Sequence, residues 1–471
     1  MKYYITCLFL FLSYLSLNAQ LKVASVLGDD MVLQRNTDAR LWGKAKSGEK
    51  LTITTSWNNL KVNATTNENG DWLVKVKTTD AGGPYTITIT SSKEKLVLKN
   101  VLLGEVWLCS GQSNMDMPID GYKDQPILGS NDILVDAEND NIRLFTGKPT
   151  GSKTLQDTIS GKWGIASAET VAKFSAVGYL YAKQLQQRLK VPIGMICLAY
   201  GGARIESWMS KETIANFPEA LSQTSDEKLK PQYKASYLYN AMLHPILNYI
   251  IKGAIWYQGE ANVPNNKGYA NLMAAMVDNW RNDFGIGDFP FYYVQLAPYF
   301  YDNSKGTTAA LLRDEQLKAQ SLIPNSGMAC TIDLGEEKVI HIADKYTVAK
   351  RLAYWAFSET YNIKGINHLS PTYRRMEVKD SAAIVYFDNL VNGLNSFGKE
   401  VESFEIAGED KVFYPAKIKT NRKDQVIVSS PNVKSPVAVR YGFCNFPVTK
   451  GFLYNTAGLP VPSFRTDDWD K

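Results

Sequence analysis

The sequence is poor in histidine and cysteine, and it lacks the charge pattern of a nucleic-acid-binding protein. Only three His and five Cys occur in 471 residues, and no Cys/His spacing is typical of a zinc site. The 52 Lys and Arg against 47 Asp and Glu give a net charge of +5, and no basic cluster interleaves with aromatic residues. The sequence therefore predicts neither a metal ion nor nucleic acid as a ligand.

Long hydrophobic runs are absent except at the N-terminus. Lys2 precedes the apolar segment ITCLFLFLSYLSL at 5–17, and the small residue Ala19 follows it. The segment is shorter than the roughly 20 residues that cross a bilayer, so it is typical of a secretory signal peptide. We predict a signal peptide at 1–20, a periplasmic or extracellular location, and no transmembrane anchor after its removal.

Four cysteines remain in the predicted mature chain. Three of them lie in apolar, strand-like runs, which favours buried free thiols, although an oxidising compartment permits a disulfide. Their pairing stays open. The four are Cys109, Cys197, Cys330 and Cys444.

The chain divides into three segments by pattern. Residues 21–100 alternate polar and apolar positions, as at 51–54 and 85–90, and predict a small sandwich-like β module. Residues 365–471 return to β character, as at 382–387 and 425–428, and predict a C-terminal β module.

Between them, at 101–364, apolar runs of strand length alternate with amphipathic helical stretches. This pattern predicts a parallel sheet covered on both faces. The expected strands are 105–110, 193–200, 253–257, 291–296 and 328–332, and the expected helices are 175–189, 269–282, 308–322 and 343–360.

Polar loops follow four of these strands. In an open parallel sheet, ligands bind at the carboxyl ends of the strands, so we expect the loops to converge at one edge. They are GQSN at 111–114, GGAR at 201–204, QGEAN at 258–262, and DLGEE at 333–337 with His341 after it.

These loops contain the groups that acyl transfer needs: a nucleophile, a base, an orienting group for the base, and donors for the oxyanion. Ser113 is the candidate nucleophile. Its own backbone N–H, the N–H of Gly202 and the side-chain amide of Gln258 are candidate oxyanion donors. We further predict that four polar residues of the same loops bind the substrate: Gln112, Asn114, Glu260 and Arg204.

The general base follows from the small number of histidines. His244 lies in the apolar stretch AMLHP, which indicates packing or a structural hydrogen bond, and His368 lies outside the sheet order. His341 follows the last strand and precedes a helix, so we predict it as the base. The serine is not in a G-x-S-x-G turn, because Met115 replaces the second glycine, and this disfavours an α/β-hydrolase.

Several blocks resemble those of the bacterial sialate O-acetylesterases, within the SGNH hydrolase superfamily. The resemblance extends from about residue 21 to the end. It is carried by GEVWLCSGQSNMDMPI at 104–119, YGGARIESWMS at 200–210, WYQGEANV at 256–263, LRDEQ at 312–316, DLGEEKVIHIADK at 333–345 and NTAGLPVPSFRTDDW at 455–469.

The resemblance implies a flavodoxin-like three-layer α/β/α catalytic domain with flanking N- and C-terminal β-sandwich-like modules. It also implies removal of acetyl groups from O-acetylated sugars without a metal or organic cofactor. The matching blocks again indicate Ser113 as nucleophile, Gly202 and Gln258 as oxyanion donors, and His341 as base.

One position departs from the family. Similar esterases read Asp-Ile-His where this chain has Lys338, Val339 and Ile340 before His341. The orienting group is then Glu337, with Asp333 next and Glu336 as a further alternative, or a backbone carbonyl serves in a dyad. The choice matters because the loss of an orienting carboxylate costs roughly 10⁴ in kcat in a well-studied triad.

Three functions follow from the sequence. The first is a secreted carbohydrate O-acetylesterase acting on sialic acid acetyl esters, with a pH–rate limb near the ordinary His pKa of about 6.5. The second is an esterase for acetylated plant polysaccharide such as xylan. The third, suggested by the missing Asp, is a non-catalytic secreted carbohydrate-binding protein. The oligomeric state is not predicted.

Overall fold

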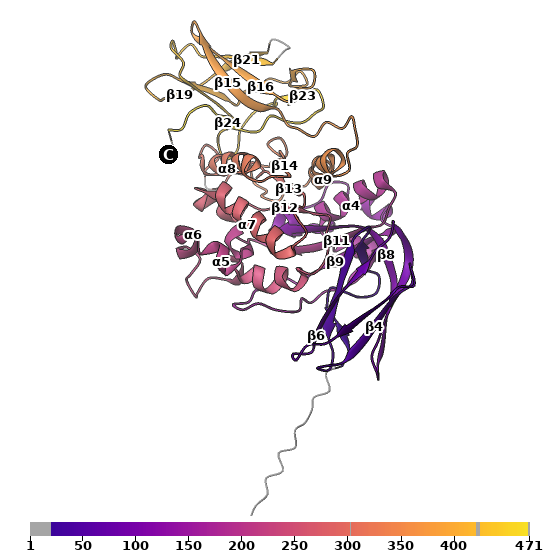
Figure 1. Cartoon of the computed structure of the whole chain (residues 1–471). Coiled ribbons are helices and arrows are strands. Elements are labelled where there is room, and N and C mark those ends of the chain that lie inside the picture. Colours follow the sequence, from indigo (N-terminus) through magenta and orange to yellow (C-terminus); the bar gives the residue numbers. More distant parts are fainter. Residues whose placement is uncertain (1–19, 302, 421–423, 470–471) are drawn as a thin grey trace, which may run out of the picture.

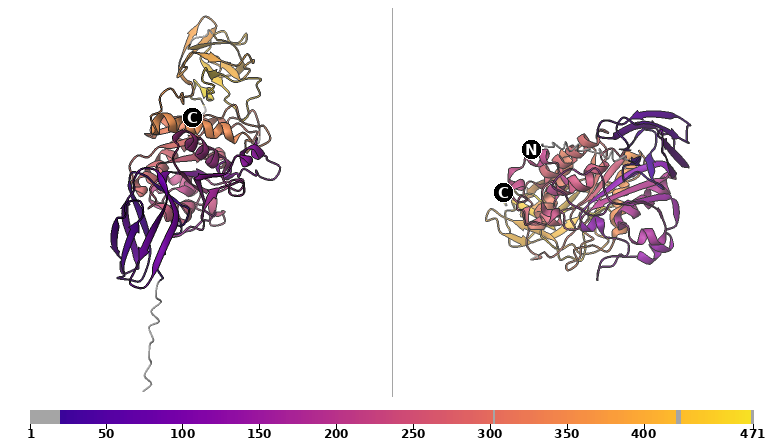
Figure 2. Two further views of the ribbon diagram at one scale, coloured as in Figure 1. Left: turned by 90° about the vertical axis from the view of Figure 1, so that its right-hand side faces the viewer. Right: turned by 90° about the horizontal axis from the view of Figure 1, so that it is seen from below.

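The computed structural model describes residues 20–301, 303–420 and 424–469. The predicted signal peptide therefore lies outside the described residues, apart from Gln20. Three parts follow one another along the molecule: an N-terminal β module, a central α/β domain and a C-terminal β module (Figures 1 and 2). No helix among the described residues has both the length and the apolar character to span a bilayer.

The central sheet has the strand order β10-β9-β11-β8-β12-β13-β14. All of these strands are parallel except the edge strand β10. Without the edge pair β9 and β10, the chain order across the sheet is 2-1-3-4-5, which is the flavodoxin-like order. The strands are β8 (Lys95–Gly111), β9 (Asn139–Thr146), β10 (Trp163–Ala166), β11 (Ile193–Ala199), β12 (Gly253–Tyr257), β13 (Phe291–Val294) and β14 (Ser326–Ala329).

Helices cover both faces of this sheet, because its side chains are apolar in both directions. In β13, Phe291 and Tyr293 belong to one buried cluster, while Tyr292 and Val294 belong to the other. Helices α7 and α8 pack on the first cluster, and α4 and α9 pack on the second. The helices are α1 (Ser113–Asp116), α2 (Ser130–Val135), α3 (Ala168–Ala172), α4 (Ala176–Leu189), α5 (Lys211–Ile214), α6 (Pro218–Ser222), α7 (Tyr269–Phe284), α8 (Thr308–Leu322) and α9 (Lys345–Trp355).

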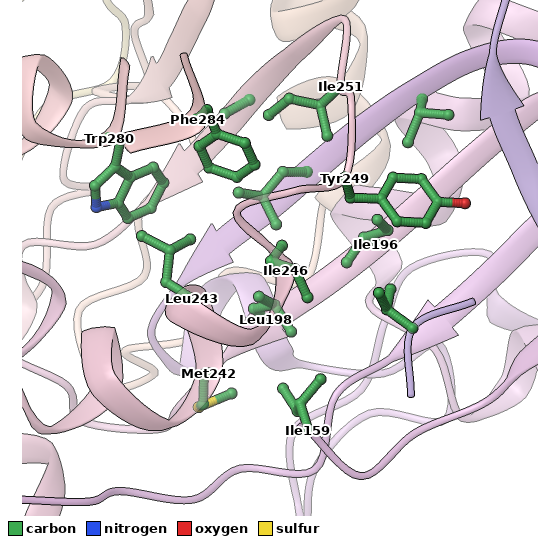
Figure 3. Packing of buried hydrophobic residues seen from close by; sticks show 14 of the residues in the cluster. Ile159, Ile196, Leu198, Met242, Leu243, Ile246, Tyr249, Ile251, Trp280 and Phe284 are labelled. Atoms are coloured by element: carbon green, nitrogen blue, oxygen red, sulfur yellow. The ribbon is translucent and has the colours of Figure 1, made fainter. Parts of the chain in front are cut away.

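Figure 3 shows the first cluster, where Ile196 and Leu198 of β11 meet Trp280 and Phe284 of α7 and the segment that carries Tyr249. Short 3-10 and π helices build this irregular part. They are η1 (Ile205–Trp208), η2 (Pro231–Tyr233), η3 (Tyr239–Leu243), η4 (His244–Ile246) and η5 (Glu260–Asn265), and η6 (Ala356–Thr360) continues α9.

The N-terminal module shares a strand with the central domain. The first part of β8 pairs with β7 and β2, and its last part pairs with β11 and β12. The boundary predicted between residues 100 and 101 thus lies inside one continuous strand. The remaining strands of the module are β1 (Lys22–Val23), β2 (Val32–Gln34), β3 (Asp38–Lys44), β4 (Lys50–Thr55), β5 (Lys61–Thr65), β6 (Asp71–Lys77) and β7 (Gly82–Thr90).

The C-terminal module has two four-stranded antiparallel sheets and a core of its own. Arg313 of α8, fully buried, attaches it to the central domain by donating to the Ser463 hydroxyl at 3.0 Å and the Gly442 carbonyl at 3.2 Å. The strands are β15 (Thr372–Lys379), β16 (Ala382–Asp388), β17 (Leu394–Asn395), β18 (Phe404–Ala407), β19 (Phe413–Pro415), β20 (Lys417–Thr420), β21 (Gln425–Ser429), β22 (Ala438–Tyr441), β23 (Tyr454–Asn455) and β24 (Phe464–Arg465).

The predicted fold class, a three-layer α/β/α domain between two β modules, is confirmed. The four predicted helices are present within a few residues, while the edge strands β9 and β10 were not predicted. All four cysteines of the described chain are free thiols. Cys109, Cys197 and Cys330 are buried, as predicted.

Candidate active site

Ser113 lies where β8 ends, next to the end of β12. This is the switch point of the sheet, where ligands bind in folds of this order. Gly111 makes the approach possible: its φ is 142°, and a Cβ there would lie 2.1 Å from the Tyr257 carbonyl oxygen. Ser113 begins α1 and is half-buried, so its hydroxyl is held at the sheet edge without being enclosed.

His341 contacts Ser113, although the two residues lie near opposite ends of the sequence of the central domain. Its Nε2 lies 2.7 Å from Ser113 Oγ. The histidine comes from the loop between β14 and α9, and Asp344 caps that helix by accepting from the Thr347 N–H at 2.9 Å. The Tyr122 ring packs edge-on against the imidazole, with ring centres 5.1 Å apart. The predicted nucleophile and base are therefore brought together.

The other imidazole nitrogen faces an amide. Gln125 Oε1 lies 2.7 Å from His341 Nδ1. An amide oxygen only accepts, so this contact places the proton on Nδ1 and leaves the Nε2 lone pair toward Ser113. Gln125 stands in a short turn, where its backbone exchanges two hydrogen bonds with Tyr122, and the Leu128 N–H fixes the same loop to the Ala343 carbonyl.

None of the three predicted carboxylates hydrogen-bonds to His341 in the described structure. Asp333 is paired with Arg351 through two contacts of 2.7 Å. Glu336 is exposed, and its backbone forms a bridge with Val339. The Glu337 carbonyl accepts from the Phe300 N–H. Gln125 takes the place at Nδ1 that was predicted for these carboxylates.

The two predicted backbone donors, the N–H groups of Ser113 and Gly202, belong to adjoining loops. A Cβ on Gly201 would lie 3.8 Å from Ser113 Cβ, and Gly202 follows with φ 71°. Among the described residues, neither the Ser113 N–H nor the Gly202 N–H donates to a protein acceptor. Both are therefore available to a developing oxyanion.

Gln258 is differently engaged. Its Nε2 donates to the Ala203 carbonyl at 2.9 Å and to Asn262 Oδ1 at 2.7 Å, and its Oε1 accepts from the Tyr269 hydroxyl. The side chain is fully buried. To act as an oxyanion donor, Gln258 Nε2 would have to exchange one of these two hydrogen bonds for one to the substrate. In the described structure the side chain joins two of the site loops.

A buried polar network lies behind Ser113. Asn114 accepts from Lys345 Nζ and donates to Glu260 and to the Ile340 carbonyl. Gln112 accepts from the Gly259 and Ala261 N–H groups. Gln112 and Asn114 are almost fully buried and Glu260 is 8% exposed, so their observed contacts brace the loops. Their predicted contact with substrate stays a prediction.

Burial and charge lower the basicity of the imidazole. Desolvation, together with the positive charge of Lys345, lowers the pKa of His341 to about 4. Desolvation also lowers the pKa of Lys345 to about 7, although Glu260 opposes this. Because Gln125 is neutral, no carboxylate raises the His341 pKa from the Nδ1 side.

The remaining predicted residues lie outside this pair. Arg204 stacks over the Tyr233 ring at 5.5 Å and donates to the Gln223 carbonyl at 3.3 Å. His244 Nδ1 lies 2.8 Å from the Gln156 carbonyl, which agrees with its structural interpretation. His368 faces Glu359 at 3.1 Å, far along the chain from the site loops.

A family model described as carbohydrate esterase, sialic acid-specific acetylesterase, matches residues 103–356, which is more than half of the chain. The chain belongs to this family. It is accordingly a carboxylic-ester hydrolase, and the predicted resemblance to the sialate O-acetylesterases is confirmed. The matched range spans β8 to the end of α9 and so contains all the site loops.

Relatives match over almost the whole length. The sialate O-acetylesterase of Pongo abelii is 29% identical, with 94% of this chain and 92% of that protein covered. The Mus musculus enzyme of the same name is 27% identical, with 94% of each covered. The crystal structure of a carbohydrate acetylesterase from Xanthomonas citri is 32% identical, covers 95% of this chain and all of its own, and has a TM-score of 0.87. The last match confirms the SGNH-type fold with its flanking β modules.

Sequence reasoning missed two residues of the site. Gln125 lies 216 positions from His341 in a loop without a recognisable pattern, and no spacing signals it. Lys345 lies in one of the blocks that carry the family resemblance, four residues after His341, but its complete burial was not evident from a helix start.

Proposed function

We propose that this chain is a carbohydrate O-acetylesterase that forms an acetyl-enzyme on Ser113. The observation that carries the proposal is the 2.7 Å approach of His341 Nε2 to Ser113 Oγ, within the range of a general base and its nucleophile. Membership of the sialic acid-specific acetylesterase family supports it, as do relatives named sialate O-acetylesterase.

In the first half-reaction, Ser113 Oγ attacks the acetyl carbonyl carbon while His341 Nε2 takes the hydroxyl proton. The N–H groups of Ser113 and Gly202 stabilise the tetrahedral oxyanion. The C–O bond to the sugar then breaks, and His341 returns its proton to the leaving sugar hydroxyl. Gln125 accepts from Nδ1–H throughout, which keeps the imidazole in the tautomer that the step requires.

In the second half-reaction, water attacks the acetyl-enzyme and His341 takes a proton from it. The tetrahedral intermediate collapses, acetate leaves, and the Ser113 hydroxyl regains its proton. The cycle consumes an ester and a water and yields a sugar hydroxyl and acetic acid. No step needs a cofactor.

The test is acetate release from O-acetylated sialic acids and from acetylated xylan fragments, with the wild type and Ser113→Ala. We expect release from acetylated sialic acid, and loss of release in the variant with an unchanged circular dichroism spectrum. Ser321→Ala, an exposed serine on α8, is the matched control and keeps full activity. Undiminished turnover in Ser113→Ala would sink the mechanism. Release from xylan alone would reassign the substrate to plant polysaccharide.

The Gln125 contact also bears on the non-catalytic alternative. That alternative arose from the missing Asp before His341, but the imidazole has an orienting partner in the structure. Inhibition by a serine-directed fluorophosphate, with one equivalent bound at Ser113, would exclude a purely carbohydrate-binding role.

We further propose that the chain is secreted, on the pattern of residues 1–20. The expected mature N-terminus is close to residue 20, and mass spectrometry of the protein from the periplasm or medium measures it. Recovery of an intact N-terminus from the cytoplasm contradicts secretion.

A further inference from the structure

A cavity of about 560 Å³, lined by both polar and apolar residues, lies beside the site loops, and its lining includes neither Ser113 nor His341. Its volume is within the range of roughly 300–1,000 Å³ typical of small-molecule sites. Two chain segments line it, and each continues directly from a site loop. One leads through η1 to α6, and the other leads from η5 into α7. Figure 1 shows α5 and α6 on the same side of the domain as α7.

A series of contacts connects Ser113 with this cavity. Gly201 borders Ser113, and the next residue, Gly202, borders the Tyr233 hydroxyl, which would lie 3.5 Å from a Cβ at that position. Arg204 stacks on the Tyr233 ring and donates to the carbonyl of Gln223, which lines the cavity. The cavity is therefore adjacent to the loop that carries the Gly202 oxyanion donor.

Two buried polar atoms on this path have no hydrogen-bond partner within the described chain. They are Arg204 Nε and Gln232 Oε1, and Gln232 is only 8% exposed. The Arg204 backbone N–H donates to the Gln232 carbonyl, so the two unpartnered atoms belong to neighbouring residues. Neither residue lines the cavity itself, so they mark the contact path from Gly202 to it and not its wall.

The lining chemistry matches a sugar. Amide groups both donate and accept hydrogen bonds, as sugar hydroxyls do. The Phe217 ring and Leu272 add apolar surface. The amide residues are Asn216, Gln223, Asn265, Asn266 and Asn271.

The charge of the lining favours an uncharged occupant. Glu206 and Glu219 stand against Lys267, so the charged residues sum to one negative charge when all are ionised. The Glu206 carboxylate is held in place because Asn262 Nδ2 donates to both of its oxygens, at 3.0 and 3.2 Å. This negative charge would repel the carboxylate of an acidic sugar, whereas it would not repel an uncharged sugar.

We propose that this cavity binds a second, uncharged sugar residue of the glycan, next to the residue whose acetyl ester meets Ser113. The inference rests on the proposed esterase function and adds a binding subsite to it. The substrate is then an oligosaccharide or polysaccharide, and the cavity distinguishes it from a free acetylated sugar.

The test uses exposed lining residues, so that folding is not at risk. Gln223→Ala and Asn271→Ala are combined, and Asn282→Ala, an exposed amide on the same helix α7 but outside the cavity, is the matched control. With O-acetylated sialyllactose we expect the double variant to raise KM roughly tenfold, since two neutral hydrogen bonds are lost. Its kcat, and its turnover of p-nitrophenyl acetate, stay at wild-type values.

Binding without chemistry separates this inference from the esterase proposal. In the Ser113→Ala background, calorimetry with unacetylated sialyllactose, whose lactose part is the uncharged neighbour, gives binding that the double variant weakens roughly tenfold and Asn282→Ala does not. Equal dissociation constants in the double variant and the background overturn the subsite, as does the absence of sialyllactose binding. Tighter binding of a disialic acid, whose second residue is charged, that depends on the same two residues overturns the uncharged class. Acetate release by Ser113→Ala would contradict the proposed mechanism but not the subsite. The binding measurement would still decide whether the subsite exists.

Discussion

The two nitrogens of His341 face two different kinds of structure. On the Nε2 side, Ser113 stands at the end of a central strand, and the residues on either side of it, Gln112 and Asn114, are held by buried hydrogen bonds. On the Nδ1 side, Gln125 lies in a half-buried turn between two short helices. The nucleophile thus depends on the sheet, whereas the orientation of the base depends on a loop.

The largest expected effect is on the pair itself. His341→Ala removes the base, and we expect kcat to fall by on the order of 10⁵ to 10⁶, as in other serine hydrolases. His244→Ala is the matched control, because that ring lies outside the site and its hydrogen bond in the described structure is to the Gln156 carbonyl. Acetate release by both variants measures the difference. A loss below about a hundredfold for His341→Ala would mean that another group serves as base.

The loop side of the comparison is tested by Gln125→Ala. Removing the acceptor leaves Nδ1–H without its partner and frees the ring to adopt the wrong tautomer. We expect kcat to fall roughly tenfold to a hundredfold, in line with about 1–3 kcal/mol for a lost buried partner. The exposed Gln187→Ala on α4 is the control. Unchanged kcat in Gln125→Ala would show that the loop does not orient the base.

The pH dependence sharpens the same contrast. His341 acts as a base only when neutral, and its pKa is lowered to about 4. The acid limb of kcat/KM should therefore lie near pH 4, with activity lost as the pH falls through this value, and not near the 6.5 expected from the sequence. Gln125→Glu places a carboxylate at Nδ1, which stabilises the imidazolium and moves the limb to higher pH. A limb at the same pH in both proteins would contradict the Nδ1 contact.

The smallest effect concerns Lys345, which lies on the sheet side. Its positive charge contributes to the lowered pKa of His341, after desolvation. Lys345→Met should raise the acid limb of kcat/KM by a few tenths of a pH unit to about one unit. Lys350→Met, one turn further along α9, removes an equal charge outside the network and should leave the limb in place. An equal shift of the acid limb in both variants would show that the effect comes from the net charge of the protein and not from the position of Lys345.

Lys345 also links the network to stability. Its folded-state pKa, about 7, lies below the ordinary lysine value of 10.5, so the unfolded chain binds more protons between these values. This group therefore favours folding fully above about pH 10.5, and its contribution is lost as the pH falls toward 7. Thermal unfolding at pH 7 and pH 9 measures how much the melting temperature changes with pH. We expect Lys345→Met to show a smaller change than the wild type.

Much of the fold was predictable because, in the central domain, the spacing of apolar residues in the sequence matches the positions that are buried. The strands of the central sheet are apolar on both faces, as Trp256 and Tyr257 illustrate, and this pattern predicted a parallel sheet between helices. Strand β9, next to the edge strand β10, was missed because its first residues are polar and largely exposed. The division at residue 100 was drawn where composition changes, but β8 continues through it since both modules use the same strand.

The sequence by itself predicted the proposed nucleophile, the proposed base and the edge of the sheet at which they meet, because the succession of strands along the chain and the loops after them follow from local patterns. Tertiary structure alone decided the partner of His341 Nδ1. Gln125, Asp333 and Glu337 are all polar residues in loops, and only the folded chain brings the first to the ring while pairing the second with Arg351. The direction of the His341 pKa also depends on folding, since desolvation and the buried Lys345 act only once the network is packed.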